Sequence, residues 1–169
     1  MSTARPSQPW PPHALVGIRY DLDQLERSVR NRPDGRTDEE HIWLTRFLAV
    51  RVCGYLEQVV FEVVIAYIHE KSGGPVRAFA LSWLGRSQNP SPGNIETILG
   101  RFDLRLQEEF QRFIDTDDQR LRRELQFLLD RRHKIAHGLN EGLTPTKALA
   151  LKCDIAAIAD WFFQHMRPS

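Results

Sequence analysis

The sequence predicts an all-α protein built as an up-and-down helical bundle. Apolar residues recur at the three- and four-residue spacing of amphipathic helices along most of the chain, and no alternating strand pattern is flanked by hairpin turns. Short segments that contain Gly and Pro separate the helical stretches, which is typical of neighbouring helices in a bundle. The 169 residues suit one domain, and a hydrophobic content of 41% is enough to form its core.

The Pro- and Ser-rich residues 1–13 predict a flexible arm, followed by a single helical domain over residues 14–169. Its first helix is expected from about residue 14 to residue 30, before the turn residues Asn-Arg-Pro-Asp-Gly. Thr37 or Asp38 can cap a long second helix that continues to about Lys71. Charged residues interrupt its most apolar run, which predicts a buried central helix and not a membrane span.

Three shorter helices and two longer ones complete the prediction. The short helices are expected over residues 76–85, 95–102 and about 104–114, with Asn94 as the cap of the second. Thr116 or Asp117 is expected to start the next helix, and Gly138 to end it. Thr144 followed by a proline is a favourable start for the last helix, which is expected to continue to about residue 166.

Composition narrows the function classes. A net charge of +1 gives no overall electrostatic field that would indicate a nucleic acid or a membrane as binding partner. Cys53 and Cys153 make no disulfide framework, and the N-terminus has no apolar signal region, so a cytoplasmic protein is expected. Nineteen of the 23 basic residues are Arg, which binds phosphate well. A GC-rich codon bias explains that excess equally well.

The stretch from Leu128 to Asn140, LLDRRHKIAHGLN, contains the candidate site. On a helix Leu121, Leu125 and Leu128 all fall within about 40° of Arg132, so this Arg lies on the apolar stripe. A charge there is costly unless it is paired or faces a cleft. Both interpretations, a structural salt bridge and a cation facing a cleft, remain open.

His137 falls about 140° from Arg132 on an ideal helix, so the two do not share a face. Either the helix unwinds before Gly138, or a second copy of the chain completes a shared cleft. His133 and His137 also have the spacing of two zinc ligands, but Lys134 stands between them and no third ligand has a telling spacing. We therefore predict no metal, and no cofactor, because no nucleotide-binding fingerprint is present.

The spacing of Arg132 and His137 is not specific by itself, because Arg36 and His41 repeat it. That second pair spans a predicted loop and helix start, which indicates capping charges and a surface His. The segment RRHKIAHG near a helix end, however, resembles the signature of the HEPN superfamily: Arg, a polar residue, three further residues and His. The segments VRVCGYLEQVVFEVVIAYI and NPSPGNIETILGRFD resemble its RiboL-PSP subgroup, so the likeness runs from about Asp38 to the C-terminus.

The resemblance implies a helical bundle that pairs two signature helices across a twofold axis in a homodimer. It also implies a metal-independent endoribonuclease that uses the 2′-OH of RNA as nucleophile. His137 would be the general acid or base and Arg132 the phosphate clamp. Arg131, His133 and Lys134 would be further substrate contacts. Glu57, in the second helix, would orient Arg132, although a structural ion pair with another Arg is an open alternative.

HEPN proteins include toxins and antiviral (phage-defence) effectors, so the resemblance implies RNA as substrate and a neutralising partner such as an antitoxin or a nucleotidyltransferase-like protein. Other members have lost catalysis. The alternative function is therefore a silent HEPN-type module that binds nucleotides or a regulatory partner.

Overall fold

The computed structural model describes residues 9–84, 89–139 and 142–167, and these residues form an all-α fold without strands. Seven helices follow one another: α1 (His13–Arg30), α2 (Asp38–Lys71), α3 (Gly74–Leu84), α4 (Pro92–Phe102), α5 (Leu104–Ile114), α6 (Thr116–Ala136) and α7 (Pro145–His165). The predicted all-α bundle is confirmed. Within the described residues, no helix combines the length and apolarity needed to cross a membrane.

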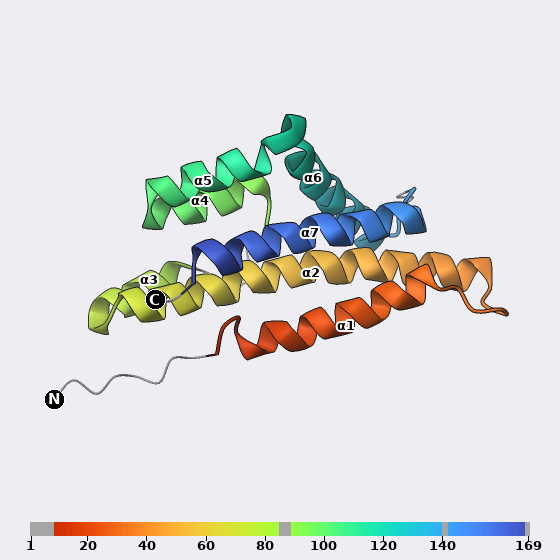
Figure 1. Cartoon of the computed structure of the whole chain (residues 1–169), viewed down its shortest axis with the longest axis horizontal. Coiled ribbons are helices and arrows are strands. Elements are labelled where there is room, and N and C mark those ends of the chain that lie inside the picture. Colours follow the sequence, from red (N-terminus) through yellow and green to blue (C-terminus); the bar gives the residue numbers. More distant parts are fainter. Residues whose placement is uncertain (1–8, 85–88, 140–141, 168–169) are drawn as a thin grey trace.

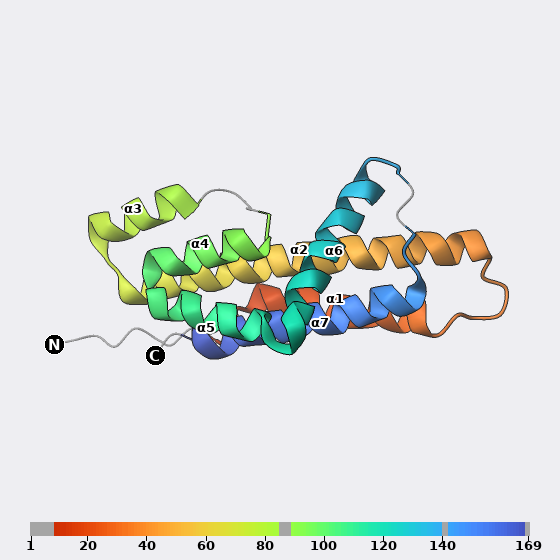
Figure 2. The same ribbon diagram turned by 90° about the horizontal axis from the view of Figure 1, so that it is seen from above.

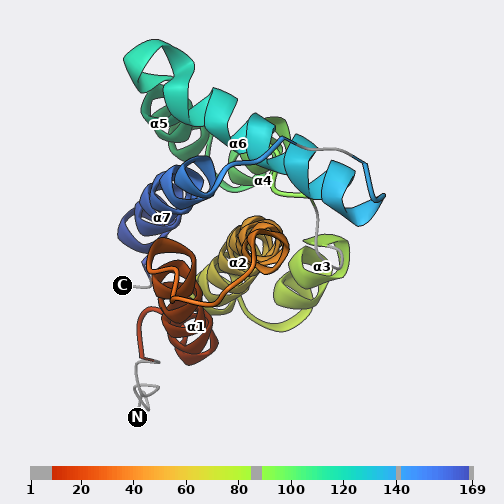
Figure 3. The same cartoon turned by 90° about the vertical axis from the view of Figure 1, so that its right-hand side faces the viewer.

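The long helix α2 is the central element, as its apolar run predicts. Helices α1, α3, α6 and α7 all contact it, and Figure 3 shows them grouped around it. A capping box fixes its start: the Thr37 side chain accepts a hydrogen bond from the Glu40 backbone N–H, and the Glu40 carboxylate accepts one from the Thr37 N–H. Twelve of its residues are buried, and they cover more than half of the helix circumference.

Three long helices, α1, α2 and α7, lie side by side, and α4 and α5 form an antiparallel pair beside them (Figures 1 and 2). The helices do not simply alternate in direction, because α7 runs parallel to α2 (Figure 1). Helix α6 makes this possible: it crosses obliquely over α7 and α2 before the chain enters α7 (Figures 2 and 3). The crossing places the C-terminal end of α6 beyond α2.

Two helix starts differ from the prediction. Helix α4 begins at Pro92 and is capped by Ser91, whose hydroxyl accepts a hydrogen bond from the Asn94 N–H, so Asn94 is not the cap. The first turn of α6 is left-handed at residues 117–119, with φ between 56 and 59°. Arg123 donates to the carboxylate of Asp118 at 2.9 Å and so holds this turn. The right-handed part of α6 therefore begins at Arg120.

A charged cluster joins α1 to α7. Lys152 on α7 contacts Asp23 at 2.5 Å and Glu26 at 2.7 Å on α1, and Arg30 contacts Glu26 at 2.6 Å. The hydrogen bond from Lys152, together with that from Arg30, lowers the pKa of Glu26 below its ordinary value of 4.5. At the other end of α1, Trp10 donates its indole N–H to the backbone oxygen of Phe163 at 2.9 Å. Trp10 belongs to the segment expected to be an arm, whose residues 1–8 lie outside the described part of the chain.

Replacing Lys152 by Met should destabilise the protein by about 2 kcal/mol at neutral pH, because two carboxylates on α1 lose a shared partner. A carboxyl whose pKa is lowered by folding stabilises the fold above its unfolded pKa, and this contribution is lost as the pH falls. Lowering the pH from 7 to below 4.5 should therefore reduce the free energy of unfolding less in Lys152→Met than in the wild type. Urea unfolding at both pH values measures this.

Lys147→Met is the matched control. Lys147 also bridges α7 to a carboxylate, that of Glu124, but its side chain is 35% exposed against 12% for Lys152. Replacing Lys147 should therefore lower the free energy of unfolding by less than replacing Lys152 does. Equal losses in the two variants would contradict a special role for the α1–α7 cluster.

Candidate active site

The apolar stripe of α6 fixes the rotation of this helix. Leu121, Leu125, Leu128 and Leu129 are buried against the bundle, and Arg132 follows on the same face one turn later. Helix α6 crosses α2 in this region (Figure 2), so the stripe carries Arg132 onto α2. The expected position of this Arg on the buried face of α6 is thus confirmed.

Arg132 meets a carboxylate on α2. Its Nη2 lies 3.2 Å from Oε1 of Glu57, and the two side chains are 42% and 15% exposed. The thiol of Cys53, one turn earlier on α2, donates to the same carboxylate oxygen at 3.9 Å. Burial, followed by the charge of Glu57, raises the pKa of Cys53 to about 12, so this residue remains a thiol. Glu57 therefore holds one edge of the guanidinium while the rest of Arg132 reaches solvent.

Helix α6 ends at Ala136 in a Schellman turn. The Gly138 N–H donates to the Ile135 carbonyl at 3.1 Å, and the Leu139 N–H donates to the Lys134 carbonyl at 2.9 Å. Gly138 has φ +67°, a conformation that favours Gly. His137 is the last residue before this glycine, with φ −98° and ψ 8°, and is exposed. The helix thus ends where the sequence predicts, and His137 lies on the cap.

Three further residues predicted as substrate contacts surround this end of α6. The rings of His133 and His137 are neighbours, with centroids 4.4 Å apart. Lys134 contacts the carboxylate of Asp130 at 3.1 Å. The Arg131 guanidinium lies over the ring of Phe127 at 4.3 Å, and its side chain is only 21% exposed. His133 and Lys134 are therefore more accessible to a ligand than Arg131.

Within one chain, the ring of His137 contacts His133 and not Arg132. The two candidate catalytic residues thus lie at the same helix end, each accessible from solvent, without direct contact. A group of three or more His, Cys, Asp or Glu side chains able to hold a metal ion does not occur among the described residues.

The second Arg–His pair has a different setting. Arg36 donates to the backbone oxygen of Ser28, and its own carbonyl accepts from Arg32, so it closes the loop between α1 and α2. His41 lies in the first turn of α2, just after the capping box of Thr37. The contacts of Arg36 are structural, as the sequence indicates, but His41 is partly buried, with its Nδ1 enclosed, and is not the expected surface residue.

An exposed apolar stripe on α2, which the sequence analysis did not identify, leads to the site. Trp43 and Phe47 are 57% and 53% exposed, and Val50 and Gly54 continue their line. These four residues and Glu57 fall within about 80° on a helix. Nothing lies within 4 Å of the position that a Cβ on Gly54 would take. This Trp43 stripe is therefore an open surface that ends at the carboxylate holding Arg132.

The family described as RiboL-PSP-HEPN matches residues 18–162, which include all the candidate site residues. The match begins within α1, so it extends further towards the N-terminus than the likeness expected from about Asp38. No curated protein and no solved structure matches significantly.

Replacing Arg132 by Leu should lower the free energy of unfolding by about 1–3 kcal/mol, because the largely buried carboxylate of Glu57 loses its partner. Adding Glu57→Gln should restore most of this loss, because an amide needs no cation. The measurement is a double-mutant cycle from urea unfolding curves. Unchanged stability in Arg132→Leu would mean that the ion pair only orients Arg132 and does not stabilise the fold.

Proposed function

Because the chain belongs to the RiboL-PSP-HEPN family, whose relatives suggest a ribonuclease or RNA-related role, we propose that it is a metal-independent endoribonuclease. The observation that carries the proposal is the end of α6. There Glu57 holds Arg132 half exposed, at the same helix end as the neighbouring imidazoles of His133 and His137. A fixed cation and exposed acid–base groups are the parts that RNA transesterification needs.

In the proposed reaction the ribose 2′-OH attacks the adjacent phosphorus and the bond to the 5′-oxygen breaks. His137 takes the proton from the 2′-OH or gives one to the departing 5′-oxygen. The products are a 2′,3′-cyclic phosphate and a 5′-OH. RNA supplies the nucleophile, which explains why DNA would not be cut.

Arg132 is suited to stabilise the charge that gathers on the non-bridging phosphate oxygens. A guanidinium has five N–H donors in a fixed plane. One edge contacts Glu57, and this contact sets the direction of the plane before a substrate arrives. An electrostatic group that is oriented in advance needs no reorganisation during the reaction. His133 and Lys134, both accessible, would contact neighbouring phosphates.

We also propose that the active unit is a twofold homodimer formed through the Trp43 stripe. Trp43 and Phe47 are large, more than half exposed and aligned along α2, and such surfaces mark interaction sites. Gly54 has no side chain, so a second helix can approach α2 closely beside Glu57. A second copy seated there would bring its own α6 end towards Arg132, which compensates for the separation of Arg132 and His137 within one chain.

We propose that in the cell this ribonuclease acts as a toxin or antiviral effector. An antitoxin or a nucleotidyltransferase-like partner would control it. Expression should then arrest growth, and His137→Ala should relieve the arrest. Equal growth with both forms would favour the alternative, a silent nucleotide- or partner-binding module.

His137→Ala should reduce cleavage of total RNA by roughly a hundredfold or more, since it removes the general acid or base. Wild-type cleavage should persist in EDTA and leave cyclic-phosphate ends, detectable by mass spectrometry. His41→Ala is the control, because it has the same position in the second Arg–His pair, and it should cut normally. Activity that disappears in EDTA and returns with a divalent metal would overturn the mechanism.

Light scattering should give twice the 19.6 kDa mass of the chain for the wild type. Trp43→Glu with Phe47→Glu should shift the protein to a monomer, because two charges cannot be buried without partners. The same variant should lose RNA cleavage while circular dichroism remains helical. Tyr20→Glu, at an exposed aromatic residue on α1, is the control and should leave the mass unchanged. A wild-type monomer at micromolar concentration would contradict the shared site.

A further inference from the structure

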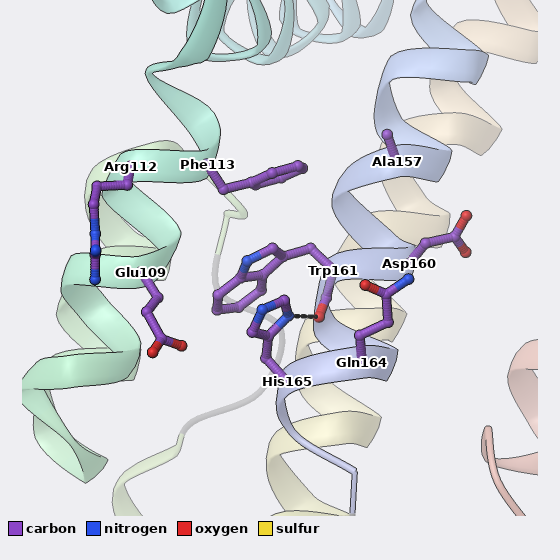
Figure 4. Close-up of a pocket in the computed structure, with 8 residues that line it drawn as sticks. All are labelled: Glu109, Arg112, Phe113, Ala157, Asp160, Trp161, Gln164 and His165. Atoms are coloured by element: carbon purple, nitrogen blue, oxygen red, sulfur yellow. Dashed lines mark hydrogen bonds between the residues drawn. The ribbon is translucent and has the colours of Figure 1, made fainter.

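A hollow lies between α5 and α7 (Figure 4). Its volume is about 610 Å³, within the range of small-molecule sites. The residues that line it are Glu109, Arg112 and Phe113 on α5 and Ala157, Asp160, Trp161, Gln164 and His165 on α7. None of them belongs to the candidate active site.

One wall is a ladder of aromatic rings held rigidly by the core. Trp161 is 5% exposed, and Phe110, which is fully buried, packs edge-on against it at 5.0 Å. Phe113 stacks on Trp161 at 6.2 Å, with 23° between the ring planes. His165 stacks on Trp161 at 4.4 Å, with only 12° between the planes. The ladder therefore needs no rearrangement to receive another flat ring.

His165 ends the ladder. Its Nδ1 lies 2.8 Å from the Trp161 backbone oxygen, which can only accept a hydrogen bond, so Nδ1 carries the proton. In the neutral ring Nε2 is then an acceptor. One face of the imidazole covers Trp161, and the residue is exposed towards the hollow (Figure 4).

The facing wall on α5 carries one acceptor and one donor. Glu109 and Arg112 are both exposed, and Figure 4 shows the Glu109 carboxylate directed into the space that His165 borders from α7. Arg112 donates its Nε–H to the Glu108 carbonyl at 3.3 Å, a contact that orients the guanidinium. Figure 4 shows this side chain on the side of Glu109 that is away from His165. The carboxylate of Asp160, by contrast, is held by Arg19 at 3.1 Å.

A flat heteroaromatic ring with a donor edge would satisfy the features that border this space. The ring would extend the aromatic ladder at His165, where stacking gives affinity without sequence preference. Its donor edge would face Glu109. Guanine is the nucleobase that places a ring N–H beside an amino group, so it can donate two parallel hydrogen bonds to one carboxylate. Adenine and cytosine place a ring acceptor beside the amino group.

We propose that the hollow between α5 and α7 binds a guanine nucleotide, with the base stacked at His165 and its donor edge on Glu109. The base can come from a free nucleotide or from single-stranded RNA. The proposal stands apart from catalysis, because it uses none of the residues assigned to cleavage.

Calorimetric titration of the full chain with GMP, AMP and UMP tests it. GMP should bind at least tenfold more tightly than AMP or UMP, because only guanine gives the carboxylate two donors. Glu109→Gln should remove this preference, and His165→Ala should weaken all three nucleotides. Glu108→Gln is the matched control, because Glu108 is adjacent on α5 but does not line this hollow, and it should bind GMP as the wild type does.

A short 2′-O-methylated RNA containing guanine, which lacks the nucleophile for cleavage, separates the two sources. Binding of this RNA that Glu109→Gln weakens, with no binding of GMP, would assign the hollow to RNA. Binding of GMP as tight as that of the RNA would assign it to free nucleotide. Equal affinities for GMP and AMP, or a Glu109→Gln variant that binds every ligand as the wild type does, would overturn the proposal. Circular dichroism of each variant confirms folding.

Discussion

The candidate active site depends on one ion pair, that between Arg132 and Glu57. A cation on the apolar face of α6 can be tolerated only where the facing helix offers a carboxylate. The leucines before Arg132 are fully or nearly fully buried, so they determine where along α2 that carboxylate must stand. Packing of α6 on α2 and orientation of Arg132 are thus a single constraint. The Schellman turn at Gly138 is a second constraint on the site, because it ends the helix directly after His137.

Local signals in the sequence predicted much of the fold. The long helix α2 starts at the capping box formed by Thr37 and Glu40 and ends before a Gly-Gly-Pro segment. Both ends are thus encoded by a few neighbouring residues. The same holds for Thr144 and the start of α7. The periodicity of α6 also placed Arg132 on the buried face. The family comparison then confirmed the resemblance drawn from the short Arg–His segment.

Features that depend on contacts between distant segments were not predicted. The cap of α4 is Ser91 and not Asn94, which lies three residues later, and both residue types can cap a helix. The left-handed turn at residues 117–119 depends on how α5 meets α6. The Trp43 stripe has a readable helical spacing, but only the packed bundle shows which side of α2 remains uncovered. The hollow at Trp161 needs α5 and α7 together.

The position of α7 has a consequence for how the protein is made. Helix α7 leaves the ribosome after the other six described helices, yet it packs on both α1 and α2 and carries the lysine that joins α1. Contacts between such distant segments form late, after a large loss of chain entropy. During synthesis the apolar sides of α2 therefore stay open until α7 emerges. Helix α6 cannot be anchored in a finished core before that moment, so any activity at its end begins only when the chain is complete through α7.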